Sequence, residues 1–491
     1  MDLGELMRRI PHSARIPDGP SGGVPRTEIA GLTADSRAVR PGFLFAALPG
    51  TRADGRAYIA DAVARGASAV LAPPGTDWPP GVPPRPLIVD PEPRRRLAQF
   101  AAAFHRAQPE TVVAVTGTNG KTSTVDFLRQ IWTGAGHRAA GLGTLGVIAP
   151  GRPAGAGLTT PDPVALHAML AELAADHIDH AAMEASSHGL DQFRLDGVRL
   201  AAAAFTNLTR DHLDYHGDLA AYRAAKLRLF EELLPAGAPA AASAGMEAET
   251  LAALAAIAQR RQLKLLTVGE GGNAIRLLSA MPRTDGQDLD VEVFGARRGV
   301  RLPLVGRFQA DNALLAAALA YATGTDAAFD LLAGLAGVRG RLELAAVLPN
   351  GAAVYVDYAH TPDALERLLA ALRPHTSRNL WCVFGAGGDR DPGKRPLMGA
   401  AVAAHADAAI VTDDNPRTED PAAIRAAVRA AIPMAREIGD RRAAIAAAME
   451  ALGPGDVLAV AGKGHEQGQT VGREVLPFDD VSVVRDLAGL A

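Results

Sequence analysis

The sequence is nearly free of cysteine, because Cys382 is the one cysteine among 491 residues. A single cysteine excludes an internal disulfide and is typical of proteins from a reducing cytosol, so we expect a cytoplasmic protein. Cys382 lies in the apolar run 380–384, Leu-Trp-Cys-Val-Phe. That run predicts a buried strand residue and not a metal ligand or a nucleophile.

Long apolar runs and large blocks of like charge are also missing. Residues 1–20 mix apolar residues with charges of both signs. No stretch approaches about 18 uninterrupted apolar positions, so we expect neither a signal peptide nor a membrane span. Lysine and arginine number 50 against 54 aspartates and glutamates. The one short basic block, Arg94-Arg95-Arg96, is typical of the solvated first turn of a helix, so nucleic acid is not an expected partner.

The most informative segment that is present is a glycine-rich loop at residues 116–122, Thr-Gly-Thr-Asn-Gly-Lys-Thr. It lies between a strand-like run at 112–115 and a helix-like stretch at 123–132. In this context backbone N–H groups point at phosphates, Lys121 reaches the β and γ phosphates, and the Thr122 hydroxyl can bind Mg²⁺. ATP is therefore the expected energy source. The generic spacing has glycine where Val115 stands, so the loop is a shortened variant; an ordinary strand-turn-helix corner is the alternative.

Length and apolar patterning predict three domains of the α/β class. At about 150 residues per domain, this length suggests roughly three. Alanine-rich segments at helical spacing, such as 310–336, alternate with short Val/Ile/Leu/Ala runs, as a mostly parallel α/β architecture requires. The proline-rich stretch 73–93 and the segment 338–341 interrupt this pattern. We therefore expect domains at 1–105, 106–338 and 339–491.

Two polar clusters follow apolar runs in the second of these domains, where their side chains would emerge at strand ends. Glu184 lies in the segment 183–190, and His212 lies in the segment 206–214. Glu184 suits Mg²⁺ beside the phosphate loop, since this ion prefers a carboxylate together with phosphate oxygens. His212 is placed to approach a metal or the γ-phosphate, although a capping aspartate with a structural histidine gives the same pattern.

Further segments carry a resemblance to a known family. They are Val356–Asp363, Gly388–Arg390, Gly393–Pro396, Asp414–Arg417 and Ala461–Glu466. With the loop and the two clusters, they make nearly the whole chain similar to the Mur ligase family of ATP-dependent amide-forming enzymes in peptidoglycan synthesis. The resemblance implies a central P-loop ATPase-type sheet flanked by an amino-terminal UDP-binding α/β domain and a carboxyl-terminal Rossmann-like domain. Asp414–Arg417 resembles the signature of members that add meso-2,6-diaminopimelate to UDP-N-acetylmuramoyl-L-alanyl-D-glutamate.

The resemblance also implies a reaction and its catalytic residues. In the family, the glutamate carboxylate attacks the γ-phosphate of ATP, and the incoming amine then displaces phosphate from the acyl phosphate. Positioned cations must offset the repulsion between carboxylate and polyphosphate. The implied catalytic residues are Lys121, Glu184, His212, Lys226 and Asp357. Mg²⁺ is implied at Thr122, Glu184, His212 and Lys226, the last as a carbamate; an ordinary exposed helix lysine is the alternative for Lys226.

Nucleotide recognition in the family is shared between domains that close over ATP. The matching residues are Gly117, Thr118, Asn119, Gly120, Lys121, Thr122, Ser123, Asn312, Arg341 and His360. Asn312 resembles the residue next to the adenine, whereas Arg341 and His360 match positions in the last domain. The pattern alone also fits a surface arginine at a domain boundary, and a histidine that caps a helix beginning at Pro362.

The UDP-sugar and its peptide are implied to bind the first two domains. The implied contacts are Ala34, Ser36, Thr51, Arg52, Ala53, Thr159, Thr160, Ser186, Gln192 and Arg194. Arg194 suits an acidic substrate because a guanidinium pairs both oxygens of a carboxylate. Without the resemblance, the segments 34–37 and 51–55 would be interpreted as turns.

The amino-acid pocket is implied to contain Arg390, Asp414, Asn415, Pro416, Arg417, Gly462 and Glu466. Meso-diaminopimelate differs from lysine by a distal carboxylate, so lysine would leave buried Arg390 and Arg417 unpaired. An unpaired buried group costs about 1–3 kcal/mol. Sites built to pair a polar group of the substrate discriminate against an analogue without that group by a factor of roughly 10⁴. Asp414 and Glu466 are placed to accept the distal ammonium, and Gly462 allows close backbone approach. A polar turn at 414–417 is the alternative.

Two positions depart from the family pattern, Gln309 where asparagine is usual and Gly468 where an aromatic residue is common. Neither is assigned to chemistry. Folylpolyglutamate synthase and Mur ligases that add lysine or D-alanyl-D-alanine are the enzymatic alternatives, separated by Asp414–Arg417 and by a uridine-binding domain. A nucleotide-gated binding protein without turnover is a further alternative, but it would not need two metal positions. We expect a monomer.

Overall fold

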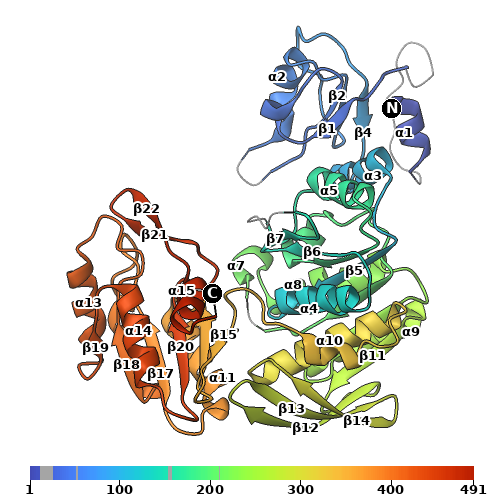
Figure 1. The fold of residues 1–491 in the computed structure, drawn as a ribbon. Coiled ribbons are helices and arrows are strands. Elements are labelled where there is room, and N and C mark those ends of the chain that lie inside the picture. Colours follow the sequence, from blue (N-terminus) through green and yellow to red (C-terminus); the bar gives the residue numbers. More distant parts are fainter. Residues whose placement is uncertain (11–25, 51–52, 153–157, 210, 491) are drawn as a thin grey trace. The chain divides into compact units, whose positions relative to one another are not determined.

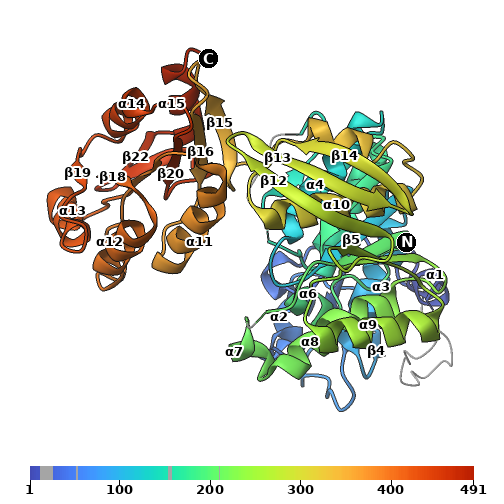
Figure 2. The ribbon, with the colours of Figure 1, turned by 90° about the horizontal axis from the view of Figure 1, so that it is seen from below.

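The computed structural model describes residues 1–10, 26–50, 53–152, 158–209 and 211–490, with residues 213 and 214 described by their backbone only. The chain folds into two compact units, which Figures 1 and 2 draw as ribbons. The first contains residues 1–266 and 319–325, and the second contains residues 267–318 and 326–491.

The first unit begins with a small parallel sheet in the order β1-β2-β3-β4. Its strands are β1 (Gly31–Thr33), β2 (Phe43–Ala46), β3 (Ala69–Ala72) and β4 (Leu87–Val89), and its helices are α1 (Leu3–Arg8), α2 (Ile59–Ala64) and α3 (Pro93–His105). Successive strand residues point to opposite faces. Leu44 therefore packs in one core with α1 and α3, whereas Phe45 packs in the other with α2.

A larger sheet follows, with the phosphate loop at its centre. Its strands within this unit run in the order β11-β10-β9-β5-β8-β6-β7. They are β5 (Thr111–Thr116), β6 (Ala139–Gly143), β7 (Gly146–Ile148), β8 (His180–Glu184), β9 (Ala202–Phe205), β10 (Pro239–Ser243) and β11 (Lys264–Gly269), of which β7 runs antiparallel to β6. The run Val112–Val115 is wholly buried in β5, as expected for a parallel strand covered by helices on both faces.

The helices of this part connect the strands. They are α4 (Lys121–Gly134), α5 (Pro163–Ala175), α6 (Ser187–Asp191), α7 (Leu213–His216), α8 (Leu219–Arg228), which continues as a π-helix over Leu229–Leu233, and α9 (Ala248–Arg261). Helix α4 begins directly at the phosphate loop, and α8 carries Lys226 in its last turn. Helix α10 (Arg307–Ala322) contains residues of both units.

The second unit contains an antiparallel meander and a mainly parallel sheet. The meander is β12 (Ile275–Arg283), β13 (Gly286–Val293) and β14 (Ala296–Leu302). The parallel sheet has the order β15-β16-β20-β17-β18-β19, and β15 alone is antiparallel to its neighbour. Its strands are β15 (Glu343–Val347), β16 (Ala353–Asp357), β17 (Leu380–Phe384), β18 (Ala408–Val411), β19 (Arg436–Glu437) and β20 (Val457–Ala461).

Helices cover both faces of this parallel sheet, as Figure 2 shows. One face packs against α11 (Pro362–Leu372), α12 (Lys394–His405) and α13 (Pro421–Arg429). The other face packs against α14 (Arg441–Ala451) and α15 (Asp480–Leu487). A hairpin of β21 (Gly468–Val471) and β22 (Glu474–Pro477) follows β20.

In each unit the sheet brings polar loops to one edge. Strands β5, β8 and β9 are parallel neighbours, with Val115 opposite Glu184 and Thr116 opposite Phe205. The loops after them therefore meet at their carboxyl ends, the usual location of ligand sites in α/β sheets. In the second unit the loops after β16, β17, β18 and β20 meet in the same way, since Asp357 is opposite Ala461 and Phe384 is opposite Val411.

The α/β class is confirmed, and so is the burial of Cys382 in β17. Two local predictions are wrong. The helix predicted over 310–336 is present as α10 only as far as Ala322, and a short 3₁₀ turn follows at Asp330–Gly334, because glycines and polar residues interrupt the segment. Arg96 is not solvated: it is buried, and its guanidinium Nε lies 2.7 Å from the Asp90 carboxylate.

The predicted domain boundaries remain predictions. The two units do not divide the chain at residues 105 and 338, since both of these positions lie inside a unit. Among the described residues, no helix is both long and apolar enough to cross a lipid bilayer.

Candidate active site

The loop between β5 and α4 has the backbone of a phosphate-binding loop. Gly117 and Gly120 have φ angles of 143° and 83°, which disfavour other residues. A Cβ at Gly117 would also collide with the hydroxyl of Thr206. The Lys121 ammonium donates to the carbonyls of Gly117 at 2.9 Å and Thr118 at 2.8 Å. These bonds hold the ammonium against the loop that is predicted to bind the phosphates.

The end of β8 places oxygen ligands beside the loop. The Thr122 hydroxyl donates to Glu184 Oε1 at 2.9 Å, and the Thr144 backbone N–H donates to the same oxygen at 2.9 Å. Burial raises the pKa of Glu184, although the two threonines and Lys121 oppose this shift. Hydroxyl and carboxylate oxygens are the donors that Mg²⁺ prefers, so Thr122 and Glu184 fit this ion.

Lys226 is not the exposed helix lysine that the sequence left open. Its residue is 1% exposed, and its ammonium donates to the Gly117 carbonyl at 2.8 Å. It also lies 4.5 Å from the centre of the Tyr222 ring, whose hydroxyl is 3.2 Å from the Thr118 hydroxyl. Burial, together with the charge of Lys121, lowers the pKa of Lys226 to about 6. A lowered pKa makes the unprotonated, nucleophilic amine easier to form beside the phosphate loop than it is for an exposed lysine.

His212 is farther from this group. Its side chain is about half exposed, and its Nε2 lies 3.5 Å from the Asp211 carboxylate. Its ring centre is 6.2 Å from that of Tyr222. Within the described part of the chain, the one cluster of three potential metal ligands is His137, Asp179 and His180, at the opposite end of β8 from Glu184.

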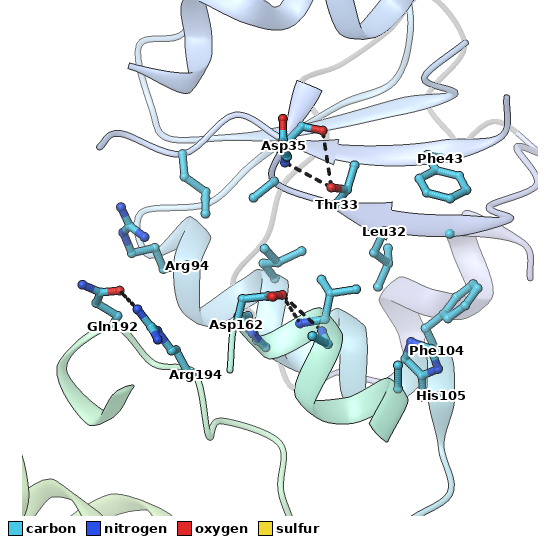
Figure 3. Close-up of a pocket in the computed structure, with 18 of the residues that line it drawn as sticks. Leu32, Thr33, Asp35, Phe43, Arg94, Phe104, His105, Asp162, Gln192 and Arg194 are labelled. Carbon is cyan, nitrogen blue, oxygen red and sulfur yellow. Dashed lines mark hydrogen bonds between the residues drawn. The ribbon is translucent and has the colours of Figure 1, made fainter. Parts of the chain in front are cut away.

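A cavity of about 750 Å³ lies in the first unit, between the small parallel sheet and α5. Figure 3 shows Asp35 and Thr33 on one side of it, and Asp162, Gln192 and Arg194 on the other. Of the predicted UDP-peptide residues, Ala34, Gln192 and Arg194 line it. Arg94, Phe104, His105 and Asp162 also line it, although the sequence predicted no role in substrate binding for any of them.

The other predicted residues of this end fall into two groups. Thr51 and Arg52 lie outside the described residues. Ser36, Ala53, Thr159, Thr160 and Ser186 are described but are not part of the cavity lining. Ser36 is buried in a 3₁₀ turn that Asp35 caps, and Ala53 is exposed.

Thr160 connects the peptide-binding candidates to the loop after β8. Its hydroxyl donates to the Glu184 carbonyl at 3.0 Å and accepts from the Ser186 N–H at 3.0 Å. Arg194 donates to the Thr160 carbonyl at 2.6 Å and to the Gln192 side chain at 2.8 Å. These residues therefore form one hydrogen-bonded set between the cavity and Glu184.

In the second unit, Asp357 at the end of β16 holds the backbone of two neighbouring segments. Its two carboxylate oxygens each accept a backbone N–H at 2.8 Å, from Leu342 and Ala359. Burial raises the pKa of Asp357, whereas the two N–H groups and nearby Arg341 lower it. Arg341 lies with its guanidinium 5.4 Å from the centre of the Tyr358 ring, and its residue is exposed.

His360 does not cap α11. Its residue is exposed, and Thr361 is the N-cap, with its hydroxyl accepting the Ala364 N–H ahead of Pro362 at the first helical position. His360 is thus available at the same sheet edge as Asp357. Asn312 is buried in α10, where its side-chain amide donates to Gln309 at 3.2 Å. Gln309, which replaces the asparagine usual in the family, therefore contacts Asn312, the residue predicted to lie next to the adenine.

The loop after β18 places a buried carboxylate at this edge. Asp414 is buried beside Gly462, where a Cβ would collide with Asp414 Oδ2. Asp414 Oδ2 has no hydrogen-bond partner within the described ranges. Asn415 accepts from buried Lys463 at 3.1 Å and donates to Glu466 at 3.0 Å. Lys463 lies in the segment Ala461–Glu466, which carries part of the family resemblance, but the resemblance implied no role for this lysine.

The two predicted arginines differ from expectation. Arg390 is exposed, so the prediction that it is a buried cation is wrong; it lies in an open loop after β17. Arg417 is half-buried and donates to the Gly388 carbonyl at 2.8 Å. Its backbone is fixed by bonds to Thr470 and Gly472 in the hairpin, so its position depends on β21 and β22. Pro416 is buried next to it.

Comparisons with known proteins agree on one family. Family models match at residues 28–105 (Mur ligase family, catalytic domain), 115–320 (Mur ligase middle domain) and 340–464 (Mur ligase, glutamate ligase domain). The UDP-N-acetylmuramoyl-L-alanyl-D-glutamate--2,6-diaminopimelate ligase of Caulobacter vibrioides is 57% identical over 92% of this chain and 94% of that protein. The protein of the same name from Rhizobium meliloti is 54% identical over 94% of both.

Solved structures give the same picture. A structure of a UDP-N-acetylmuramoyl-L-alanyl-D-glutamate--2,6-diaminopimelate ligase is 35% identical, has a TM-score of 0.77, and covers 96% of this chain and 97% of that chain. A folylpolyglutamate synthase of Mycobacterium tuberculosis complexed with ADP and AMPPCP has 21% identity and a TM-score of 0.57 over 81% of this chain and 95% of that chain. This second likeness extends to the fold alone.

Proposed function

Since the chain belongs to the Mur ligase family, we propose that it is an ATP-dependent ligase that adds meso-2,6-diaminopimelate to UDP-N-acetylmuramoyl-L-alanyl-D-glutamate. The observation that carries this proposal is the 57% identity over 92% of the chain to a protein of that activity. The arrangement of the phosphate loop, Glu184 and Lys226 supports phosphoryl transfer, and the buried carboxylate of Asp414 supports capture of an ammonium group.

The first step brings two anions together. The glutamate carboxylate forms a bond to the γ-phosphorus of ATP, the bond to the leaving ADP breaks, and an acyl phosphate results. Lys121 and the loop N–H groups offset the repulsion between the carboxylate and the polyphosphate. Without them the attacking oxygen would be repelled from its target.

Magnesium is part of the same proposal. Thr122 and Glu184 would hold one ion, and when bound it would neutralise charge on the β and γ phosphates. We propose that Lys226 carries a carbamate, which with His212 would serve a second ion. The low pKa and the buried position of Lys226 support this, since only an unprotonated amine reacts with carbon dioxide.

The second step joins the amino acid. The unprotonated amine attacks the acyl carbon, phosphate leaves, and the nitrogen gives up a proton as the amide forms. We propose that Asp414 and Glu466 receive the distal ammonium of diaminopimelate, and that Arg417 and Arg390 receive its distal carboxylate. Asn415, Pro416 and Gly462 shape this pocket.

The remaining assignments also stay proposals. In the second unit, Asn312, Arg341, Asp357 and His360 would serve the nucleotide. The cavity of the first unit would hold the UDP-sugar, with the peptide along Thr160 and Arg194; its size is in the range of small-molecule sites. A cytoplasmic, monomeric enzyme of cell-wall synthesis is the setting that we infer, and the single buried cysteine agrees with a reducing compartment.

Replacing Arg194 by alanine should weaken the UDP-peptide site specifically. The guanidinium fixes both Thr160 and Gln192, and burial lowers its pKa. We expect KM for the UDP-dipeptide to rise about tenfold, consistent with the loss of a charge-assisted contact. Initial rates at varied UDP-dipeptide and ATP measure this. Arg199→Ala, on an exposed neighbour, is the control, and an unchanged KM for the UDP-dipeptide would contradict the assignment.

Replacing Arg417 by alanine should impair use of diaminopimelate far more than use of ATP. A half-buried guanidinium that pairs a carboxylate contributes more than an exposed one. We expect kcat/KM for diaminopimelate to fall about 30-fold, or about 2 kcal/mol, with KM for ATP unchanged. Arg473→Ala, in the exposed turn of the same hairpin, is the control. Unaltered kinetics with diaminopimelate would remove Arg417 from the pocket.

The activity itself is tested by product formation. The purified chain is given ATP, Mg²⁺ and UDP-N-acetylmuramoyl-L-alanyl-D-glutamate, with diaminopimelate or lysine in parallel. We expect phosphate release only when the UDP-dipeptide and diaminopimelate are both present, with a product whose mass corresponds to their condensation. No consumption of ATP, or equal coupling of lysine, would refute the proposed function.

A further inference from the structure

A fully buried ion pair lies beside Gly462 and Asp414 in the second unit. Arg441 is the first residue of α14, and Asp480 is the first residue of α15. The guanidinium Nε and Nη2 donate to the two oxygens of Asp480, each at 2.7 Å, and both side chains are 0% exposed. Nη2 also donates to the carbonyl of Ala461 at 3.0 Å, at the end of β20. Arg441 thus contacts the residue that precedes Gly462.

Charged side chains around the buried Asp414 carboxylate influence its pKa. Arg441 and Lys463 attract its negative charge, whereas Glu466 and Asp480 repel it. Lys394 and Tyr358 also face it from α12 and from the loop after β16. Burial raises the pKa of Asp414, and Arg441 is the largest influence in the opposite direction.

Two polar atoms of the group have no partner in the part of the chain that the structure describes. They are Asp414 Oδ2 and Arg441 Nη1. A buried acceptor without a partner is costly, at about 1–3 kcal/mol, unless a ligand satisfies it. Asp480 offsets much of the charge of Arg441, so Asp414 remains free to pair with a further cation.

We propose that Arg441, held by Asp480, is a positioning residue that keeps the Asp414 carboxylate anionic and directed at the ammonium group of the incoming amino acid. The inference deepens the proposed function and rests on it. Arg441 acts through Asp414 and does not touch the substrate. An ion pair that merely joined α14 to α15 would not need to lie against the end of β20.

The same two helices provide a matched control. Arg442 follows Arg441 on α14 and pairs with Asp486 on α15, but both of these side chains are about half exposed. Exposed pairs of this kind contribute little to stability. Arg442→Gln and Asp486→Asn therefore repeat the chemical change in the same elements without altering the surroundings of Asp414.

The test is the pH dependence of kcat/KM for diaminopimelate. In Arg441→Gln the pKa of Asp414 should rise further, because its main attraction is gone. We expect kcat/KM near neutral pH to fall about 30-fold and to recover as the pH rises, with KM for ATP unchanged. The acid limb of the profile, where kcat/KM falls as the pH is lowered, should therefore move to higher pH. In Asp480→Asn a repulsion is removed, so the pKa of Asp414 should fall and the acid limb should move to lower pH. Arg441→Lys keeps the charge and should keep the acid limb.

A double variant separates electrostatics from folding. In Arg441→Met/Asp480→Leu no unpaired charge is left buried, and such replacements of buried ion pairs are often well tolerated. If Arg441 only joins the helices, this variant should regain full activity. If Arg441 acts on Asp414, the variant should melt like the wild type and show an acid limb that is raised, but by less than in Arg441→Gln, because the repulsion from Asp480 is lost together with the stronger attraction from Arg441.

The outcomes distinguish the two claims. A wild-type chain that does not couple diaminopimelate overturns the proposed function itself. A functional wild type in which Arg441→Gln and Asp480→Asn leave the acid limb in place, or in which the Arg442→Gln control moves it equally, overturns the positioning role alone.

Discussion

Lys121→Met should reduce kcat by about 10³-fold while the protein remains folded, because one positioned cation at a transferring phosphoryl group contributes on this scale. The Lys121 ammonium is held at the loop by two carbonyls, from Gly117 and Thr118. Burial lowers the pKa of Lys121, and the nearby carboxylates of Glu184 and Asp211 oppose that shift. Methionine keeps most of the length of the side chain but removes the charge and the two hydrogen bonds, so the loss reports on the ammonium group.

Single-turnover phosphate release and the melting temperature together measure this effect. Lys264→Met, on an exposed lysine of β11, is the matched control and should have no effect on kcat. A Lys121→Met enzyme that keeps more than about a tenth of its kcat would contradict the role of the loop lysine, since that loss corresponds to only about 1.4 kcal/mol.

Lys226→Ala should reduce kcat between about 10² and 10³-fold, the range expected when a group that stabilises developing charge is lost. The lysine is buried against the phosphate loop, where an unmodified ammonium would add a second cation beside Lys121. A carbamate would reverse the sign of that charge. We therefore expect a small carboxylate, such as formate, to restore part of the activity, because it can enter the space left by the side chain.

The rescue by a small carboxylate tests the carbamate more directly than the loss of activity does. Intact-protein mass spectrometry under bicarbonate should show the added carbon dioxide in the wild type and not in the variant. Lys264→Ala serves again as the surface control. If formate and acetate fail to increase the activity of the alanine variant over a wide concentration range, the carbamate is the part of the account that is wrong.

The sequence predicted best where a motif coincides with a strand end. The run 112–115, the glycine loop and the helix after it fix β5, the loop and α4, and parallel pairing then requires Glu184 and Thr206 to lie beside the loop. Polar residues after β16, β18 and β20 meet for the same reason. The fold class and the proximity of these segments thus follow from continuous apolar runs that form buried parallel strands, and from the connections between them.

The burial of individual charged side chains could not be predicted from the sequence. Arg390, Arg441 and Arg96 are all arginines beside helices or loops, yet the first is exposed and the other two are buried with carboxylates. Asp480 is far from Arg441 in the sequence, and Asp90 belongs to no motif that would indicate a pairing with Arg96. Whether a lysine is solvated or buried, as for Lys226 and Lys463, likewise depends on tertiary packing that no local pattern encodes.

The cavity of the first unit was only partly predicted, for a related reason. Gln192 and Arg194 were identified through the resemblance. Arg94, in the first turn of α3, and Asp162, the N-cap of α5, line the same space but have sequence patterns typical of ordinary helix starts. Asp162 does cap α5, so its capping signal concealed its position at the cavity.

The central claim is that the glutamate carboxylate becomes phosphorylated at the phosphate loop before the amide forms. The direct measurement uses UDP-dipeptide labelled with ¹⁸O in the carboxylate that accepts the amino acid, and analyses the released phosphate by mass spectrometry. The account predicts that one labelled oxygen is transferred to phosphate in each turnover and that the other remains in the new amide. Unlabelled phosphate, formed at the same rate as product, would show that no acyl phosphate lies on the path.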